Sequence, residues 1–270
     1  GAFEGTVDFD PGLGIFNMTA VGGKDIFVSK LDSDGNFVWA RNIGGVSDDL
    51  GFGIAVDSAN NVYTTGYFRG TVDFDPGPDT FNLTWTIYGT REAFVSKLDS
   101  AGNFVWARSM GATSASMIDR FHNSPIGNRP IDITLDATGN IFIADDEFVS
   151  KLDNAGNIVW DVWICNIKAN SAFDVRIYDI AVDGAGNVYT TGHFSGIIDF
   201  DPGPGTFNLN SGEGYAFVSK LDSNGNFVWA GNTGAYGYGF GIAVDSENSI
   251  YTTGSFDCTG DFDPDPGVFI

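Results

Sequence analysis

Pairs of aspartates separated by one residue recur four times in this 270-residue chain and are its side chains best suited to chemistry. Each pair lies in a D-F-D-P segment. Residues two apart on a strand face the same side, and Ca²⁺ prefers carboxylate oxygens. The sequence therefore predicts calcium sites here, with a turn carbonyl, Asp79 or Asp265 as further ligands. The paired residues are Asp8, Asp10, Asp73, Asp75, Asp199, Asp201, Asp261 and Asp263.

The alternative role for these carboxylates is structural. The chain has 30 Asp and only 5 Glu. The short Asp side chain accepts hydrogen bonds from its own backbone in turns, which Glu does less well. We therefore expect most aspartates to stabilise turns, and at the D-F-D-P segments both turn capping and calcium binding stay open.

Other residues give little support for catalysis. His122 and His193 are the two histidines, and they occupy unrelated positions, so we predict a solvated or capping role for His193. Motifs of serine hydrolases, zinc proteases and phosphate-binding loops do not occur. Paired carboxylates can hydrolyse glycosides, but pairs that recur along the chain favour structure. We expect no enzyme and no organic cofactor, and the candidates for ligand contact are Trp85, Tyr88 and His122.

Charge and composition limit the partners. The formal net charge of −22 repels nucleic acid and anionic membranes. No apolar run approaches the roughly 20 residues that span a bilayer, and residues 1–17 read as repeat sequence rather than as a signal peptide. With 13 Lys and Arg in total, the composition favours an extracellular protein, secreted or on the cell surface. We expect protein or glycan partners, or self-association, and neither nucleic acid nor membrane insertion.

Two repeated segments must position these residues. Each has alternating side chains on both sides of a polar turn, which predicts a β-hairpin. The turn glycine, for example Gly102, is predicted to be left-handed. One segment begins S-K-L-D and ends V-W, at 29–39, 96–106, 150–160 and 219–229. The other begins at Ile54, Ile133, Ile180 and Ile242.

Two hairpins make one four-stranded antiparallel unit, with strands A to D. Tandem units of this kind predict an all-β fold, a β-propeller. We predict one domain over 1–270 with four blades, in which the last A–B hairpin pairs with the first C–D hairpin to close the ring. Both chain ends carry a D-F-D-P segment, so a longer array stays open. The blades are roughly 53–110, 131–164, 178–232, and 241–270 completed by 1–45.

The D-F-D-P-G segments are predicted to form extra hairpins between strands B and C, except in the blade 131–164. In an A-B-C-D meander these inserts share one face with the D-to-A loops. Function concentrates on inserted loops, so this face is the predicted working surface. The repeated tryptophans are predicted to pack between blades: Trp39, Trp106, Trp160 and Trp229.

The pairing of I-A-V-D-x-x-x-N-x-Y-x-T-G with F-V-S-K-L-D-x-x-G-N-x-V-W resembles the bacterial β-propeller repeat family called SBBP. It is more distantly similar to NHL and quinoprotein-like propellers. The resemblance implies extracellular scaffolding or binding without a shared reaction. Our leading hypothesis is an extracellular, non-catalytic binding or structural scaffold module stabilised by Ca²⁺. The alternatives are a self-assembling filament or array subunit, and a polysaccharide-active lyase or hydrolase.

Overall fold

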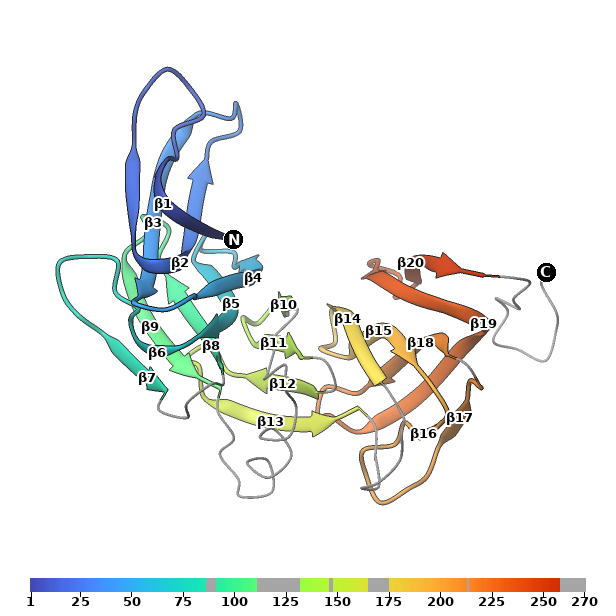
Figure 1. Ribbon diagram of the computed structural model, residues 1–270. Coiled ribbons are helices and arrows are strands. Elements are labelled where there is room, and N and C mark those ends of the chain that lie inside the picture. Colours follow the sequence, from blue (N-terminus) through green and yellow to red (C-terminus); the bar gives the residue numbers. More distant parts are fainter. Residues whose placement is uncertain (86–90, 111–131, 146–147, 165–174, 213, 258–270) are drawn as a thin grey trace. The chain divides into compact units, whose positions relative to one another are not determined.

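The computed structural model describes residues 1–85, 91–110, 132–145, 148–164, 175–212 and 214–257 (Figure 1). The ordered elements of these ranges are β-strands, which confirms the all-β prediction. No helix in them is long and apolar enough to cross a membrane. The chain divides into two compact units, Gly1–Pro130 and Ile131–Ile270. Closure of four blades into one ring stays a prediction.

The first unit contains one plain four-stranded meander. Its strands pair antiparallel in chain order, as predicted for strands A to D. Its two central strands pair on both edges and are buried at every position. The strands are β4 (Leu50–Val56), β5 (Val62–Phe68), β8 (Glu92–Leu98) and β9 (Phe104–Ser109).

The other sheet of the first unit contains both of its insert hairpins. Thr6–Asp8 pairs with Asn17–Thr19, and β6 pairs with β7, as the D-F-D-P-G pattern predicts. The end of β3 then pairs with β6, which joins the second insert to this sheet. The order is β1 (Ala2–Asp8), β2 (Asn17–Leu31), β3 (Phe37–Gly45), β6 (Gly70–Asp73) and β7 (Asn82–Trp85).

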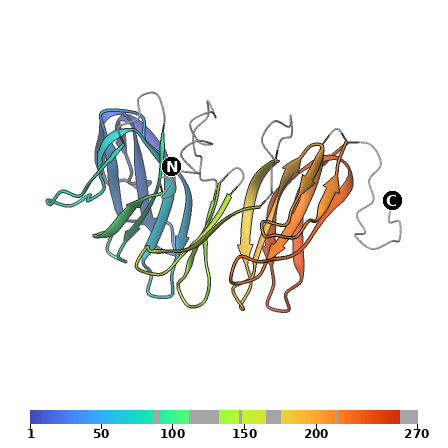
Figure 2. The ribbon, with the colours of Figure 1, turned by 90° about the horizontal axis from the view of Figure 1, so that it is seen from below.

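The second unit begins with a meander that passes from its second to its third strand without an insert hairpin, as predicted. Figure 2 shows the strands of each sheet side by side. This meander consists of β10 (Asp132–Leu135), β11 (Ile141–Ala144), β12 (Phe148–Leu152) and β13 (Ile158–Trp163).

A five-stranded sheet follows in the second unit, with an insert hairpin beside it. Its strand β19 is 18 residues long and passes from pairing with β18 to pairing with β20. The sequence predicted a glycine-rich loop there, but glycines at β-bulges let one strand bend without a break. The sheet contains β14 (Val175–Val182), β15 (Val188–Phe194), β18 (Tyr215–Leu221), β19 (Phe227–Val244) and β20 (Ile250–Phe256), and the insert is β16 (Ile197–Asp199) with β17 (Asn208–Asn210).

One side-chain arrangement closes the hairpins within these sheets. Asp32 Oδ1 accepts the N–H groups of Asp34 and Asn36 at 2.9 and 2.8 Å, and Oδ2 accepts the Asn36 amide at 3.0 Å. The turn glycine is left-handed as predicted, with φ of 79° at Gly102. The two backbone bonds recur at Asp57, Asp99, Asp136, Asp153, Asp183, Asp222 and Asp245.

These turns also hold neighbouring sheets together. The indole nitrogen of Trp39 donates to the Ser100 carbonyl at 3.3 Å, and that of Trp160 to the Ser223 carbonyl at 3.1 Å. Each carbonyl belongs to a turn of the next sheet along the chain. The predicted packing of the repeated tryptophans between sheets is confirmed for these two.

The insert hairpins contribute to the core as well as to the surface. Phe74 belongs to the second D-F-D-P segment and directly follows β6. Its ring lies 5.5 Å from that of Phe68 and 5.0 Å from that of Phe94. All three side chains are fully buried. Phe200 packs in the same way in the second unit. The inserts that contain Phe74 and Phe200 are therefore anchored to the core by apolar packing.

The glycine of the turn between β18 and β19 gives a stability test. Gly225 has φ of 83°, and a Cβ there lies 3.1 Å from the Trp160 ring. We expect Gly225→Ala to destabilise the protein by about 1–3 kcal/mol, because backbone strain and overpacking add. Gly184→Ala is the matched control, since a Cβ there meets nothing within 4 Å. Equal melting temperatures for the two variants, measured by circular dichroism, contradict the prediction.

Candidate functional site

In the three insert pairs that the structure describes, the first aspartate closes the hairpin. Asp8 is the last residue of β1, and its Oδ1 accepts the N–H groups of Asp10 and Phe16 at 3.0 and 2.8 Å. Asp73 and Asp199 make the same two bonds. The strand of each described insert ends at its first aspartate, so the two aspartates of a pair do not lie on one strand as predicted.

The second aspartate of each of these three pairs caps the following turn. Asp10 Oδ1 accepts the Gly12 N–H at 2.7 Å, and the same bond recurs at Asp75 and Asp201. One oxygen of each carboxylate is thus bonded to backbone, and the Oδ2 atoms are those that a cation would take. Among the described residues, no three His, Cys, Asp or Glu side chains form a metal cluster. Ca²⁺ would therefore complete its six to eight ligands with carbonyl groups and water.

Calcium binding at the inserts stays a prediction, and Asp261 and Asp263 lie outside the described residues. We expect Ca²⁺ to raise the melting temperature of EDTA-treated protein at about 10⁻⁴–10⁻³ M, the range of weak extracellular sites. The triple variant Asp10→Asn, Asp75→Asn, Asp201→Asn should lose this response, because an amide oxygen still caps the turn but carries no charge. A melting temperature and a titration heat that do not change with Ca²⁺ contradict the prediction.

Of the three predicted ligand-contact residues, the structure describes Trp85. Trp85 is half-buried and packs against the core cluster around Phe74, so it is less exposed than predicted. Tyr88 and His122 lie outside the described residues. His193 is buried rather than solvated: its Nδ1 lies 2.9 Å from the Gly237 carbonyl oxygen, a capping-type contact.

An aromatic stripe on β19 was not predicted. The rings of Tyr238 and Phe240 are parallel within 2° at 5.9 Å, and the hydroxyls of Tyr236 and Tyr238 lie 2.8 Å apart. His193 stacks on Tyr238 at 4.3 Å, and Phe240 is 55% exposed. The signal was present as Y-x-Y-x-F, a period-2 pattern inside a glycine-rich segment. The segment was predicted to be a D-to-A loop, in which side chains alternate to no fixed face, whereas it lies within strand β19.

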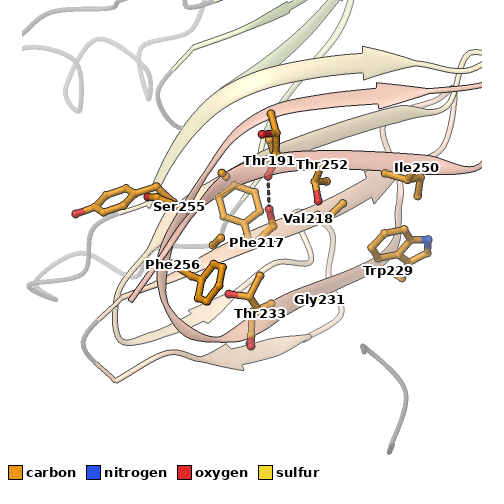
Figure 3. A pocket seen from close by; sticks show the side chains of 16 residues that line it. Thr191, Phe217, Val218, Trp229, Gly231, Thr233, Ile250, Thr252, Ser255 and Phe256 are labelled. Atoms are coloured by element: carbon orange, nitrogen blue, oxygen red, sulfur yellow. Dashed lines mark hydrogen bonds between the residues drawn. The ribbon is translucent and has the colours of Figure 1, made fainter. Parts of the chain in front are cut away.

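A pocket of about 500 Å³ lies in the second unit between β18, β19 and β20. Phe217, Trp229 and Thr252 are among the side chains that line it (Figure 3). The Thr191 hydroxyl donates to the Phe217 carbonyl at 2.7 Å, so this polar pair in the wall is already satisfied. The volume lies within the range of small-ligand pockets, and it equally fits a few side chains of a protein segment.

Two carboxyl groups away from the inserts have raised pKa values. Burial, with a hydrogen bond to the Asp179 carboxyl, raises the pKa of Asp132 to about 7. Asp179 Oδ2 also accepts the Ile242 N–H at 2.6 Å. In the first unit, burial raises the pKa of Asp49 to about 7, although it accepts the N–H groups of Gly45 and Arg69. These groups connect strands, and neither Asp132 nor Asp49 lines the pocket.

The Asp132 carboxyl predicts a pH dependence of stability. The pKa of Asp132 in the folded protein lies above the ordinary value of 3.8. Its contribution to the stability of the fold is therefore complete below pH 3.8 and is lost as the pH rises through about 7. Asp132→Asn keeps a donor for Asp179 without the charge. We expect it to stabilise the protein at pH 8 by about 1–2 kcal/mol, discounted for solvent screening, but not at pH 4.

Thermal melts at both pH values test this expectation. Asp79→Asn is the control, since it makes the same charge change at an exposed position. If the melting temperature of Asp132→Asn differs from that of wild type by the same amount at pH 4 and pH 8, the raised pKa of Asp132 is contradicted.

Comparisons with known proteins agree with this architecture. A family model described as the SBBP β-propeller repeat matches residues 38–67. The chain is also 26% identical over 265 residues to an uncharacterised WD repeat-containing protein of Acanthamoeba polyphaga mimivirus. That match covers 93% of this chain but 15% of the relative, so the chain spans a small part of that protein's length. The chain is a protein of β-propeller repeats, with an SBBP repeat at residues 38–67.

Proposed function

We propose that the chain is a non-catalytic protein-binding scaffold that acts outside the cell through its insert hairpins. Its β-propeller repeats support a binding or scaffold role, since proteins of this architecture commonly bind other proteins. Catalysis is not needed to explain the paired carboxylates of the described inserts, because backbone N–H groups occupy one oxygen of each. The extracellular location rests on the Asp-rich, Lys-poor composition alone.

The tip of the first insert hairpin is the observation that carries this proposal. Leu13 and Ile15 are 107% and 77% exposed, and they lie two residues apart at the end of a hairpin whose turn Asp10 caps. Large exposed apolar side chains at the tip of an inserted hairpin are typical of a contact for a partner protein. The sister hairpins have proline and threonine at these positions: Pro78, Thr80, Pro204 and Thr206.

Aromatic packing anchors the returning arm of this hairpin. The ring of Phe16 lies 4.8 Å from that of Phe37 in β3, which fixes the returning arm of the hairpin. Val46, in the connection after β3, is 79% exposed and adds apolar surface to the same unit. Because the surrounding protein carries a net charge of −22, the complementary partner has an apolar pocket with a basic rim.

The double variant Leu13→Pro, Ile15→Thr tests the proposal. It restores the residues of the sister hairpins, so folding and melting temperature should stay close to wild type. We expect that the tip variant no longer captures the proteins that wild type captures from the medium around the producing cells. The control is Pro204→Leu, Thr206→Ile, which places the apolar pair on another insert. Identical capture by wild type and the tip variant overturns the proposal, and capture abolished by deglycosylation of the partner redirects it to a glycan.

A further inference from the structure

Asp25 in β2 carries a buried carboxyl group that the fold satisfies at one oxygen. Its side chain is fully buried within the first unit. Asp25 Oδ2 accepts the Val21 N–H at 2.8 Å, whereas the buried Oδ1 has no hydrogen-bond partner among the described residues. No lysine or arginine of those residues forms an ion pair with Asp25. A buried carboxylate without a counter-charge is costly, so a ligand at this oxygen would stabilise the fold.

Asn42 in β3, the strand beside β2 (Figure 1), provides a second oxygen of the same kind. Phe27 lies opposite Asn42, and Asp25 precedes Phe27 by two residues, so the Asp25 and Asn42 side chains project to one face. The Asn42 amide nitrogen donates to the Thr19 carbonyl at 3.3 Å. The Asn42 Oδ1 is buried and has no donor within the described ranges. Diagonal neighbours of this kind lie about 7–8 Å apart at Cα, so the two acceptor oxygens belong to one region of the sheet.

The meander of β4, β5, β8 and β9 holds a different pair at the equivalent positions. Glu92 in β8 stands where β2 has Asp25, two residues before the phenylalanine of F-V-S-K-L. Ser109 in β9 lies opposite that phenylalanine, as Asn42 does in β3. The Ser109 hydroxyl donates to Glu92 Oε1 at 2.5 Å. This sheet therefore pairs an acid with a donor, whereas β2 and β3 place two acceptors there.

A second buried carboxyl group lies beside that of Asp25. Asp49 is fully buried, and its oxygens accept the N–H groups of Gly45 and Arg69 at 2.9 Å. A Cβ on Gly44, the residue before Gly45, would overlap the Asp25 carboxylate, so both acids meet the end of β3. Burial, and to a smaller extent the charge of Asp25, raises the pKa of Asp49 to about 7. The Arg69 guanidinium forms no ion pair with either acid among the described residues.

A water molecule would satisfy the two oxygens but not the charge. It can donate to both Asp25 Oδ1 and Asn42 Oδ1, yet the buried acids would stay without a counter-charge. A hard metal cation does both, because carboxylate and amide oxygens are ligands of Ca²⁺. Three His, Cys, Asp or Glu side chains do not come together for a metal ion in the described part of the chain. The amide oxygen, carbonyl groups and water are therefore needed as ligands.

We propose that the first unit binds a hard metal cation, of the class of Ca²⁺, between Asp25 and Asn42. Asp25 Oδ1 and Asn42 Oδ1 are ligands, the Asp49 carboxyl group adds negative charge, and carbonyl groups and water complete the coordination. The inference goes beyond the proposed function, since it involves neither the insert tip nor a partner protein.

The cation stabilises the base of the first insert hairpin. Residues 20–23 of β2 form a bulge against β1, directly after the strand that returns from the insert. Asp25 accepts the Val21 N–H within this bulge, and Asn42 donates to the Thr19 carbonyl at its start. A ligand shared by Asp25 and Asn42 therefore connects the bulge to β3.

Cation titrations test the site in protein whose predicted insert sites have been removed. EDTA-treated protein is titrated with Ca²⁺, Mg²⁺ or Na⁺, and the melting temperature and the heat of binding are measured. Because buried, fixed ligands bind more tightly than exposed loops, we expect a response to Ca²⁺ at about 10⁻⁷–10⁻⁵ M, below the range of the inserts. A hundredfold excess over the dissociation constant should raise the melting temperature by about 5–10 °C. The background substitutions are Asp10→Asn, Asp75→Asn, Asp201→Asn and Asp263→Asn.

Two substitutions at the site should abolish this response and keep the fold. Asp25→Asn removes the charge and supplies an N–H donor for Asn42, and Asn42→Ser introduces a hydroxyl donor like that of Ser109. Each variant should bind one Ca²⁺ fewer than the background protein. Glu92→Gln is the matched control, because it makes the same charge change at the equivalent position of a sheet whose acid already has a donor. It should keep the full response.

Equal Ca²⁺ responses of the background protein and both site variants overturn the proposal. The absence of heat and of a melting shift with all three cations also overturns it and leaves a water molecule or a proton at the two oxygens. A response to Mg²⁺ or Na⁺ in place of Ca²⁺, lost in both variants, supports the site and identifies its cation. If Asp25→Asn does not fold, Asn42→Ser decides. These outcomes are independent of the insert-tip experiment, in which Asp25 and Asn42 are unchanged.

Discussion

The hydrogen bonds that the carboxylate of the turn aspartate accepts are the interaction on which most of this structure depends. One oxygen accepts two backbone N–H groups, and in most copies the other accepts the asparagine amide, so one short side chain closes the whole reversal. The asparagine amide bond lowers the pKa of Asp32, Asp99 and Asp153, which keeps these groups charged well into acid. Each closed turn then presents a carbonyl at a fixed place. The tryptophan of the preceding sheet binds that carbonyl at Ser100 and Ser223, so sheet-to-sheet packing follows from turn geometry.

The same interaction accounts for the large excess of aspartate over glutamate in this chain. Aspartate reaches its own backbone two and four residues ahead, whereas glutamate is one methylene too long to do so without strain. Hairpin turns and insert hairpins together use a large share of the 30 aspartates in this way. The net charge of −22 is therefore concentrated at the ends of strands, and much of it is satisfied by backbone N–H groups. A partner meets an acidic surface whose charges are held in place.

Local sequence was sufficient to predict the strands, the turns and the insert hairpins, because each rests on contacts within a few residues. Gly102 is the simplest case, since its left-handed turn is encoded by its immediate neighbours. Predictions failed where distant residues decide the outcome. Trp85 is half-buried because core residues from other strands lie against it, and His193 is buried because β19 stacks Tyr238 on its ring. The second insert aspartate was misplaced because the first one ends the strand.

Repetition and departure from repetition have different physical consequences here. Where copies are nearly identical, neighbouring sheets pack through the same contacts, as the bonds of Trp39 and Trp160 to the following turns show. Specificity for an unrelated partner requires surface that the other copies lack. Leu13 and Ile15 replace proline and threonine, and Tyr236 and Tyr238 of the aromatic stripe stand where the first unit has Asp48 and Leu50. The repeated residues thus hold the sheets together, and in the proposed function the few that differ make the contact with a partner.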